Sequence, residues 1–170
     1  MPDGLTFVLG GARSGKSAHA ETLVASLPAP WTYIATAQAF DDEMAGRIAE
    51  HRSRRGEGWQ TVEAPVALSE AIDGLPRGRA VLVDCLTLWL SNVMMAERDV
   101  DDACRRLVSV LSRPRGPWTA VSNEVGLGIV PDTPLGRRFR DAQGRLNQQV
   151  AAVADRVILM VAGIPVEVKA

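Results

Sequence analysis

The amino-acid sequence predicts an α/β fold, in which a mostly parallel β-sheet is flanked by helices and the chain ends in a β-hairpin. Three observations lead to this prediction. Short β-branched or apolar segments alternate with longer segments of helical period. The apolar segments have no polar face, as expected of strands that are covered on both sides. No repeat, low-complexity segment or linker divides the 170 residues, so we expect a single domain over 1–170.

The first part of the chain supplies three expected strands and two helices. Residues 5–9 (LTFVL) are apolar enough for a buried strand, and a helical pattern follows over 15–26. Trp31–Ala35 (WTYIA) is the second expected strand. A polar helix is predicted over 41–55, because three acidic residues lie in its first turn, where the helix dipole favours negative charge. Trp59–Glu63 follows as a short third strand.

The central part repeats the alternation. A short helix is expected over 66–73, where a glycine stops it. Ala80–Asp84 (AVLVD) is a strongly apolar strand. Helices are predicted over 86–96 and 99–112, before a proline and a glycine break the pattern, and the strand 118–122 (WTAVS) comes next.

The last part is expected to form one long amphipathic helix and a closing hairpin. Over 134–154, apolar residues recur at steps of three and four, which places them on one face of a helix. This predicted core face consists of Leu135, Phe139, Ala142, Leu146, Val150 and Val153. The opposite face carries Arg137, Arg140 and Arg145. Strands over 157–161 and 166–169 are expected to flank a turn over 162–165.

Composition narrows the class of function. The 19 basic and 20 acidic residues give a formal net charge of −1, so we expect no nucleic-acid partner and no attraction to an anionic membrane surface. Cys85 and Cys104 provide neither a disulfide framework nor metal-ligand spacing, which favours a reducing cytoplasm. We see no signal-peptide pattern and no apolar run near the roughly 20 residues that cross a bilayer, so the expected protein is soluble, cytoplasmic and not inserted in a membrane.

The segment after the first strand reads GGARSGKS and fits the phosphate-loop (P-loop) pattern G-x-x-x-x-G-K-[ST]. Its eight residues are the first predicted nucleotide ligands: Gly10, Gly11, Ala12, Arg13, Ser14, Gly15, Lys16 and Ser17. Glycines let successive backbone N–H groups turn toward phosphate oxygens, and the following helix adds its positive N-terminal end. Lys16 is expected to reach the β- and γ-phosphates of ATP or GTP, which makes it a candidate catalytic residue. The predicted fold is therefore of the P-loop NTPase type.

A P-loop also requires an acidic partner for the Mg²⁺ that accompanies the nucleotide. Asp84 ends the most apolar expected strand and is our candidate, together with the hydroxyl group of Ser17. The alternative is that Asp84 only caps the helix that begins at Leu86.

The chain has two histidines. His19 lies just after the phosphate loop and is expected to be structural. His51 precedes the basic segment Arg52, Ser53, Arg54 and Arg55. A neutral imidazole beside a bound nucleotide could attack an α-phosphate, and guanidinium groups suit phosphate oxygens. A solvated helix end explains the arginines equally well, and a lone helical histidine is more often solvated or packed than catalytic.

Several separate segments together resemble one family. They are GGARSGKS, YIATAQAFDDEMAGRIAEHRSRRG, WQTVEAP, VLVDCLTLWLSN, SNEVGLGIVP and GRRFRDAQGRLNQQVA. In order and content they resemble the bifunctional adenosylcobinamide kinase/adenosylcobinamide-phosphate guanylyltransferases of cobalamin biosynthesis. The resemblance runs over nearly the whole chain, and unrelated P-loop proteins lack the second and fifth segments.

The resemblance implies two reactions. A nucleoside triphosphate, ATP or GTP, phosphorylates the aminopropanol hydroxyl group of adenosylcobinamide. GTP then transfers GMP to an enzyme histidine, from which GMP passes to adenosylcobinamide phosphate and gives adenosyl-GDP-cobinamide. The family's histidine corresponds to His51, which makes it a candidate catalytic residue. Some relatives carry two adjacent histidines there, whereas this chain has Glu50 before His51.

The resemblance also implies further nucleotide contacts, a recombinase-like P-loop fold and a homotrimer. The implied contacts outside the phosphate loop are Ala35, Thr36, Ala37, Arg52, Ser53, Arg54, Arg55, Glu63 and Asp84. Asn123, Glu124 and Gly126 follow an expected strand, where open parallel sheets bind ligands. They either help the substrate or metal site or form a structural turn.

The tryptophans and Cys85 admit structural interpretations. Trp31, Trp59 and Trp118 open expected strands, which favours core packing over a platform for the corrin ring. Trp89 lies in the helix after Asp84, where it could line an oligomer interface. Cys85 is expected to be a small buried residue and not a nucleophile.

Two other functions fit the P-loop. A small-molecule kinase without a covalent step would keep all its turnover when His51 is replaced by alanine. A nucleotide-dependent regulatory switch would hydrolyse nucleotide slowly, lack a phosphoryl acceptor and depend on a partner that binds the long arginine-bearing helix.

Overall fold

A computed structural model of the chain describes residues 3–38, 42, 46, 49 and 56–170. Within them, seven strands form one sheet in the order β3-β2-β4-β5-β1-β6-β7. The strands are β1 (Gly4–Gly10), β2 (Trp31–Ala35), β3 (Trp59–Glu63), β4 (Ala80–Asp84), β5 (Pro117–Asn123), β6 (Arg156–Val161) and β7 (Ile164–Lys169). Each pair of neighbours from β3 to β6 is parallel, and β7 pairs antiparallel with β6. The predicted fold class is confirmed.

The closing hairpin is tighter than expected. Its turn consists of Ala162 and Gly163, which both have positive φ angles, 50° and 81°. A two-residue turn of this hand matches the twist of the strands that it joins. β7 therefore begins at Ile164, and the prediction of a turn over 162–165 is wrong. Pro165 pairs with Met160 inside the hairpin, which is possible because β7 is an edge strand.

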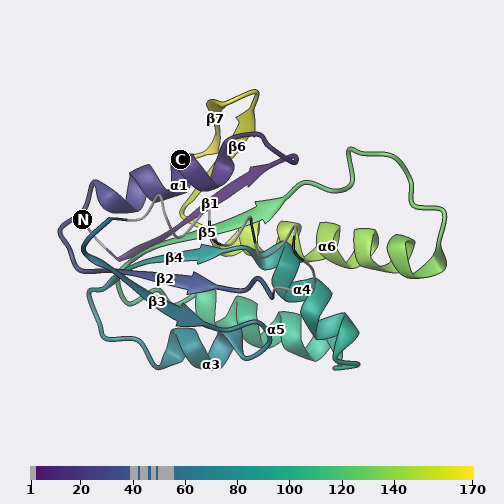
Figure 1. Cartoon of the computed structure of the whole chain (residues 1–170), viewed down its shortest axis with the longest axis horizontal. Coiled ribbons are helices and arrows are strands. Elements are labelled where there is room, and N and C mark those ends of the chain that lie inside the picture. The colour runs from purple at the N-terminus through teal and green to yellow at the C-terminus, as the bar shows by residue number, and fades with distance from the viewer. Residues whose placement is uncertain (1–2, 39–41, 43–45, 47–48, 50–55) are drawn as a thin grey trace.

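Helices cover both faces of the sheet. They are α1 (Lys16–Ala25), α3 (Leu68–Asp73), α4 (Leu86–Met95), α5 (Val100–Leu111) and α6 (Pro134–Val153). Figure 1 shows α1 on one side of the sheet and α3 and α5 on the other. None of the helices in the described ranges is both long enough and apolar enough to cross a membrane. The helix predicted over 41–55 lies outside the described residues, apart from three single positions.

The core has two layers, one on each face of the sheet. Phe7 and Val8 are adjacent in β1 and fully buried, and they belong to the two different layers. Trp89 is 1% exposed and its Nε1–H donates to the carbonyl oxygen of Val66 at 2.9 Å. The expectation that Trp89 lines an oligomer interface is therefore wrong, because this side chain packs in the core. Trp118 is also buried, as predicted.

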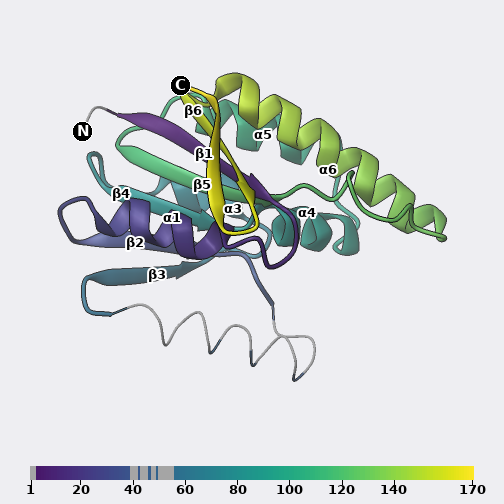
Figure 2. The ribbon, with the colours of Figure 1, turned by 90° about the horizontal axis from the view of Figure 1, so that it is seen from above.

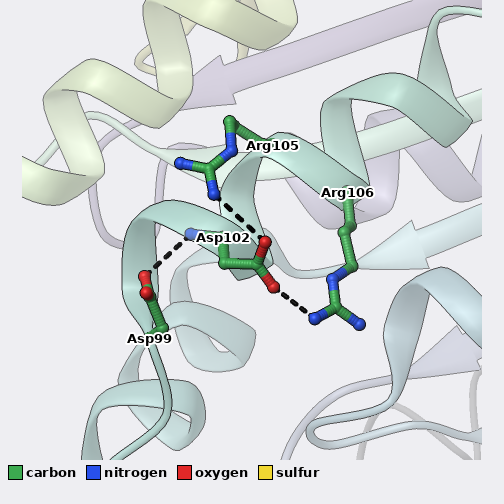
Figure 3. Close-up of polar contacts among 4 residues, drawn as sticks. All are labelled: Asp99, Asp102, Arg105 and Arg106. Atoms are coloured by element: carbon green, nitrogen blue, oxygen red, sulfur yellow. Dashed lines mark hydrogen bonds and ion pairs between the residues drawn. The ribbon is translucent and has the colours of Figure 1, made fainter.

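A capping contact explains where α5 begins. The Asp99 side chain accepts a hydrogen bond from the backbone N–H of Asp102 at 2.9 Å, so Asp99 is the N-cap and not the first helical residue (Figure 3). The Asp102 carboxylate in turn pairs with Arg105 and Arg106 on the next turn. The hydrogen bond from Arg106 is the main reason why the pKa of Asp102 lies below its usual value.

The first turns of α6 project beyond the sheet. Thr133 caps the helix by accepting from the N–H of Gly136 at 3.1 Å, and Pro134 occupies its first turn. Figures 1 and 2 both show this end reaching past the strands, at the far end of the loop that follows β5. Leu135, predicted to be in the core, is consequently 61% exposed, whereas Leu146 and Val150 further along the helix are buried.

Candidate nucleotide-binding site

Five strands bring predicted site residues to one edge of the sheet. In the register of the parallel strands, Ala35 lies beside both Glu63 and Asp84, and Gly10 lies beside Asn123. The last residue of β4 lies beside Val121 of β5, which connects the two groups. The carboxyl ends of β1 to β5 therefore form a single row, at the edge where open parallel sheets bind ligands (Figure 1).

The phosphate loop joins β1 to α1 at one end of this row. Two of its residues have left-handed backbone conformations, Arg13 with φ 55° and Gly15 with φ 88°. The N–H of Ser14 donates to the carbonyl oxygen of Gly11 at 3.3 Å, which closes the turn. Gly15 is the N-cap of α1, so the positive end of the helix points into the loop. Gly11, Ala12 and Arg13 are exposed at its rim.

Two distant segments hold the phosphate loop in place. The N–H of Glu124 donates to the carbonyl oxygen of Gly10 at 3.1 Å, and the N–H of Gly163 donates to that of Ser14 at 3.0 Å. Gly10 itself fits tightly, because a Cβ atom there would lie 2.4 Å from Ser14 Oγ and 3.1 Å from Met160. The contribution of Gly163 was not predicted, because the only signal in the sequence is a glycine in an expected turn.

Lys16 lies over the loop in a position suited to phosphate binding. Its Nζ donates to the carbonyl oxygen of Gly11 at 3.1 Å. Burial lowers the pKa of Lys16, while the charges of Cys85 and Asp84 act in the opposite direction. Phosphate oxygens would stabilise a partly desolvated ammonium group, because their hydrogen bonds replace the hydration that the group has lost.

Asp84 stands beside the loop at the end of β4. The Tyr33 hydroxyl donates to its Oδ2 at 3.2 Å. The alternative that Asp84 caps α4 is not what the structure shows: the N-cap residue is Cys85, and no side chain in the described ranges caps this helix end. The metal role of Asp84 stays a prediction, and the carboxylate lies near enough to Lys16 to raise the pKa of that side chain.

The fit to a nucleotide-associated metal ion rests on two oxygen groups. No three His, Cys, Asp or Glu side chains in the described part of the chain are arranged to hold a metal by themselves. Mg²⁺ is commonly bound by one or two protein oxygens together with phosphates and water. The hydroxyl of Ser17, in the first turn of α1, and the carboxylate of Asp84 are groups of this kind. The residues present fit such an ion.

The predicted contacts at the end of β2 have different surroundings. Thr36 is fully buried, and its hydroxyl bonds both backbone groups of Cys85, donating to the oxygen at 2.7 Å and accepting from the N–H at 2.8 Å. Its side chain therefore joins β2 to β4, and the nucleotide contact of Thr36 stays a prediction. Ala35 and Ala37 are half-buried and Glu63 is exposed. Their nucleotide contacts stay predictions.

The predicted nucleophile and its basic neighbours lie outside the described residues. They are His51, Arg52, Ser53, Arg54 and Arg55. The connection that carries them leaves β2 at Ala35, on the edge that holds the phosphate loop. Their roles stay predictions.

Buried polar side chains support the end of β5, and sequence reasoning missed most of them. Thr87 of α4 accepts from the N–H of Asn123 at 2.8 Å, and Asn147 of α6 donates to the carbonyl oxygen of Asn123 at 3.0 Å. Gln143 lies one turn before Asn147 and is fully buried. The sequence signal that could have predicted them is a pair of amide side chains, Gln143 and Asn147, four residues apart on the apolar face of an amphipathic helix.

Solved structures similar to this chain share its fold. A protein of Pyrococcus horikoshii OT3 matches with a TM-score of 0.58 and 8% identity, covering 98% of this chain and 86% of that one. An ATPase from the type III secretion system of pathogenic bacteria matches with a TM-score of 0.58 and 11% identity, covering 93% of this chain and 51% of that one. At these identities the likeness shows the fold alone.

Sequence comparisons are more specific. The chain is 47% identical over 165 residues to the bifunctional adenosylcobalamin biosynthesis protein CobP of Pseudomonas aeruginosa, covering 95% of both. It is 41% identical over 181 aligned positions to the bifunctional adenosylcobalamin biosynthesis protein CobU of Salmonella typhimurium, covering 97% of this chain and 99% of that protein. The family model described as cobinamide kinase / cobinamide phosphate guanyltransferase matches residues 6–168. The chain with this phosphate loop and sheet edge therefore belongs to the cobinamide kinase / cobinamide phosphate guanyltransferase family.

Proposed function

We propose that this protein phosphorylates adenosylcobinamide with a nucleoside triphosphate and then transfers GMP from GTP to the adenosylcobinamide phosphate. The observation that carries the proposal is the row of strand ends at which the phosphate loop, Lys16 and Asp84 meet, in a chain of this family. The phosphate loop accounts for nucleotide binding, and family membership accounts for the acceptor.

In the first reaction, the acceptor hydroxyl oxygen bonds to the γ-phosphorus while the bond from that phosphorus to the bridging oxygen breaks. The products are the phosphate ester, the nucleoside diphosphate and a proton that passes to water. Loop N–H groups and Lys16 hold the β- and γ-phosphates and stabilise the charge that the transition state carries. Mg²⁺, when bound at Ser17 and Asp84, would neutralise further phosphate charge.

In the second reaction, a nitrogen of His51 attacks the α-phosphorus of GTP and pyrophosphate leaves. A phosphate oxygen of adenosylcobinamide phosphate then bonds to the phosphorus of the attached GMP, and the phosphorus–nitrogen bond breaks. The product is adenosyl-GDP-cobinamide. The arginines at 52, 54 and 55 would hold the triphosphate during the attack.

The test of the covalent step uses the two histidines of the chain. Wild type, His51→Ala and His19→Gln are incubated with Mg²⁺ and GTP labelled at the α-phosphate, denatured and assayed for retained label. His19 is the matched control, because it lies in α1, three residues after Lys16, and has no assigned role. We expect acid-labile, alkali-stable label on wild type and His19→Gln and none on His51→Ala.

Other outcomes have definite meanings. Label on His51→Ala but not on His19→Gln would move the nucleophile to α1. No label on wild type, when GTP binding is intact and adenosylcobinamide is still phosphorylated, would leave a kinase without a covalent step. Slow hydrolysis with no phosphoryl transfer would favour a regulatory switch.

We also propose that the protein is a homotrimer of single-domain chains, as the family resemblance implies. Val161, Ile164, Val166 and Val168 of the closing hairpin are each at least 45% exposed and supply an apolar surface that another copy could cover. Sedimentation equilibrium should give three times the mass of 18.3 kDa. A monomer at micromolar concentration would exclude the trimer. In thermal unfolding, two separate transitions would exclude the single domain.

A further inference from the structure

The strand β5 lies between the two strands that carry the phosphate machinery. β1, which leads into the phosphate loop, is its neighbour on one side, and β4, which ends at Asp84, is its neighbour on the other. Asn123 ends β5 and lies beside Gly10 in the register. This position therefore lies between the phosphate loop and Asp84 in the row of strand ends.

The backbone around Asn123 is held on every side. Its N–H donates to Thr87 Oγ1 at 2.8 Å, its carbonyl oxygen accepts from Asn147 Nδ2 at 3.0 Å, and the next N–H, that of Glu124, donates to Gly10 at 3.1 Å. Three separate elements, α4, α6 and the phosphate-loop strand, thus fix one residue. A position that only ended a strand would not need this support.

A buried network stands behind these contacts. Ser122 Oγ donates to Asn147 Oδ1 at 2.8 Å, and Gln143 Nε2 donates to both of these oxygens at 2.9 Å. Ser122 and Gln143 are fully buried and Asn147 is 4% exposed. Such a network fixes the orientation of Asn147, because its Oδ1 accepts from Ser122 and Gln143 while its Nδ2 donates to Asn123.

Asn123 itself retains an unsatisfied group. Its Oδ1 is buried and has no hydrogen-bond partner in the described part of the chain. Unsatisfied buried acceptors are rare in folded proteins and call for an explanation. At the end of β5, a rotation of the amide would bring this oxygen toward a ligand on the sheet edge, where a hydroxyl group would be a suitable donor.

We propose that the Asn123 side chain binds the acceptor hydroxyl group in the kinase reaction, and that Thr87 and Asn147 are positioning residues that act through it. The inference rests on the proposed kinase function. Asn123 Oδ1 accepts the hydroxyl hydrogen and aims the oxygen at the γ-phosphorus. As the new bond forms and the nucleoside diphosphate leaves, the proton passes to water, so Asn123 orients the hydroxyl and takes no proton.

The first experiment compares threonine variants. Thr87→Val keeps the shape of the side chain but removes the oxygen that accepts from Asn123, whereas Thr87→Ser keeps it. Thr32→Val is the control, because Thr32 is equally buried but lies near the start of β2, away from the site edge. We expect Thr87→Val to lower kcat for adenosylcobinamide phosphorylation by about tenfold to hundredfold with little change in KM for the nucleotide, and Thr87→Ser to restore it.

The second experiment is a double-mutant cycle on kcat. Asn123→Ala should lower kcat about a hundredfold, and Thr87→Val should add little once Asn123 is absent, because both act through the same contact. If Thr87→Val acted through a general structural effect, its fold-loss of kcat would instead multiply with the fold-loss caused by Asn123→Ala. Should Thr87→Val fail to fold, Asn123→Ala still tests the direct contact by itself.

Two failures can be told apart. If wild type phosphorylates no adenosylcobinamide, the proposed function fails and the inference falls with it. If wild type is an active kinase and Asn123→Ala keeps its full kcat, the proposed function stands and the inference is overturned. Independent, multiplicative effects of the two substitutions would retain Asn123 as a ligand and overturn the positioning role of Thr87.

Discussion

The backbone N–H of Gly163 donates a hydrogen bond to the carbonyl oxygen of Ser14 at 3.0 Å, which joins the turn of the closing hairpin to the phosphate loop. The two residues are far apart in the sequence, yet the contact fixes the peptide between Ser14 and Gly15. That peptide leads into Gly15, which is the N-cap of α1 and has a left-handed backbone conformation. The hairpin is thereby part of the nucleotide-binding structure.

A valine at Gly163 should weaken nucleotide binding. Gly163 has φ 81°, which a β-branched residue adopts at a cost of about 1–2 kcal/mol. Relaxation of this strain should shift the N–H away from Ser14, and a loss of about 1.4 kcal/mol would raise the Kd for a GTP analogue about tenfold. Isothermal titration calorimetry measures the effect.

Gly78→Val is the matched control for this substitution. Gly78 has φ 73°, and its N–H also donates to a distant carbonyl oxygen, that of Arg115, at 2.6 Å. Both variants should lose similar unfolding free energy, but only Gly163→Val should lose nucleotide affinity. An equal loss of affinity in both would mean that general destabilisation is the cause.

Alanine at Gly10 should distort the phosphate loop, whereas alanine at Gly11 should not. A Cβ atom at Gly10 would lie 2.4 Å from Ser14 Oγ and 3.1 Å from the Cβ and carbonyl oxygen of Met160, while at Gly11 it would meet no described atom within 4 Å. Overpacking of this kind costs about 1–3 kcal/mol. Urea denaturation without nucleotide should show that loss for Gly10→Ala only; comparable loss in Gly11→Ala would point to backbone flexibility instead.

Methionine in place of Lys16 should stabilise the free protein while it abolishes activity. Burial lowers the pKa of Lys16 below its usual 10.5, so the folded state disfavours the charged form. At neutral pH the wild type bears this cost in full, and methionine keeps the apolar stem without the charge. We expect a higher free energy of unfolding for Lys16→Met at pH 7, measured with urea.

The pH dependence of that difference follows from proton linkage. Between the lowered pKa in the folded state and 10.5, the unfolded chain binds more protons than the folded one, so wild-type stability gains as pH rises through this range. The advantage of Lys16→Met should therefore shrink on the alkaline side. A difference that stays constant up to pH 10.5 would contradict the assigned burial effect.

The two thiols should be unreactive in the folded protein. Burial raises the pKa of both Cys85 and Cys104 to about 11. At pH 8 only about one thiol in a thousand is then ionised, and the thiolate is the reactive species. Ellman's reagent should label neither cysteine in the native protein and both in denaturant. Rapid native labelling that disappears in Cys85→Ser would contradict the burial of Cys85 beside Asp84.

Much of the fold could be predicted from the sequence, because local patterns determine it. Trp31–Ala35, Trp59–Glu63 and Ala80–Asp84 form strands with the predicted bounds. A short apolar or β-branched segment between two helical segments has few structural alternatives to a strand. Errors arose where tertiary position overrides local preference: Leu135 follows the core pattern of α6, but this end of the helix extends past the sheet that would have covered it.

The candidate site could be predicted only where a motif is contiguous. The phosphate loop is one continuous segment, and Asp84 became a candidate because it ends an apolar strand. Thr87, Gln143 and Asn147 meet only after α4 and α6 pack together, so their joint role has no local signature. Thr36 lies in a contiguous segment that resembles the family. That resemblance alone could not predict the hydrogen bonds between its hydroxyl group and the backbone of Cys85.

The position of β1 between β5 and β6 has a consequence for synthesis of the protein. β1 is made early, but its neighbours in the sheet are β5 and β6, which end at Asn123 and Val161. The phosphate-loop strand therefore lacks its second neighbour until β6 has been synthesised, and such long-range pairing slows folding. Nascent chains that stop before Arg156 should hold β1 beside β5 alone, without the contact of Gly163 to the phosphate loop, and should bind a GTP analogue more weakly than the folded protein.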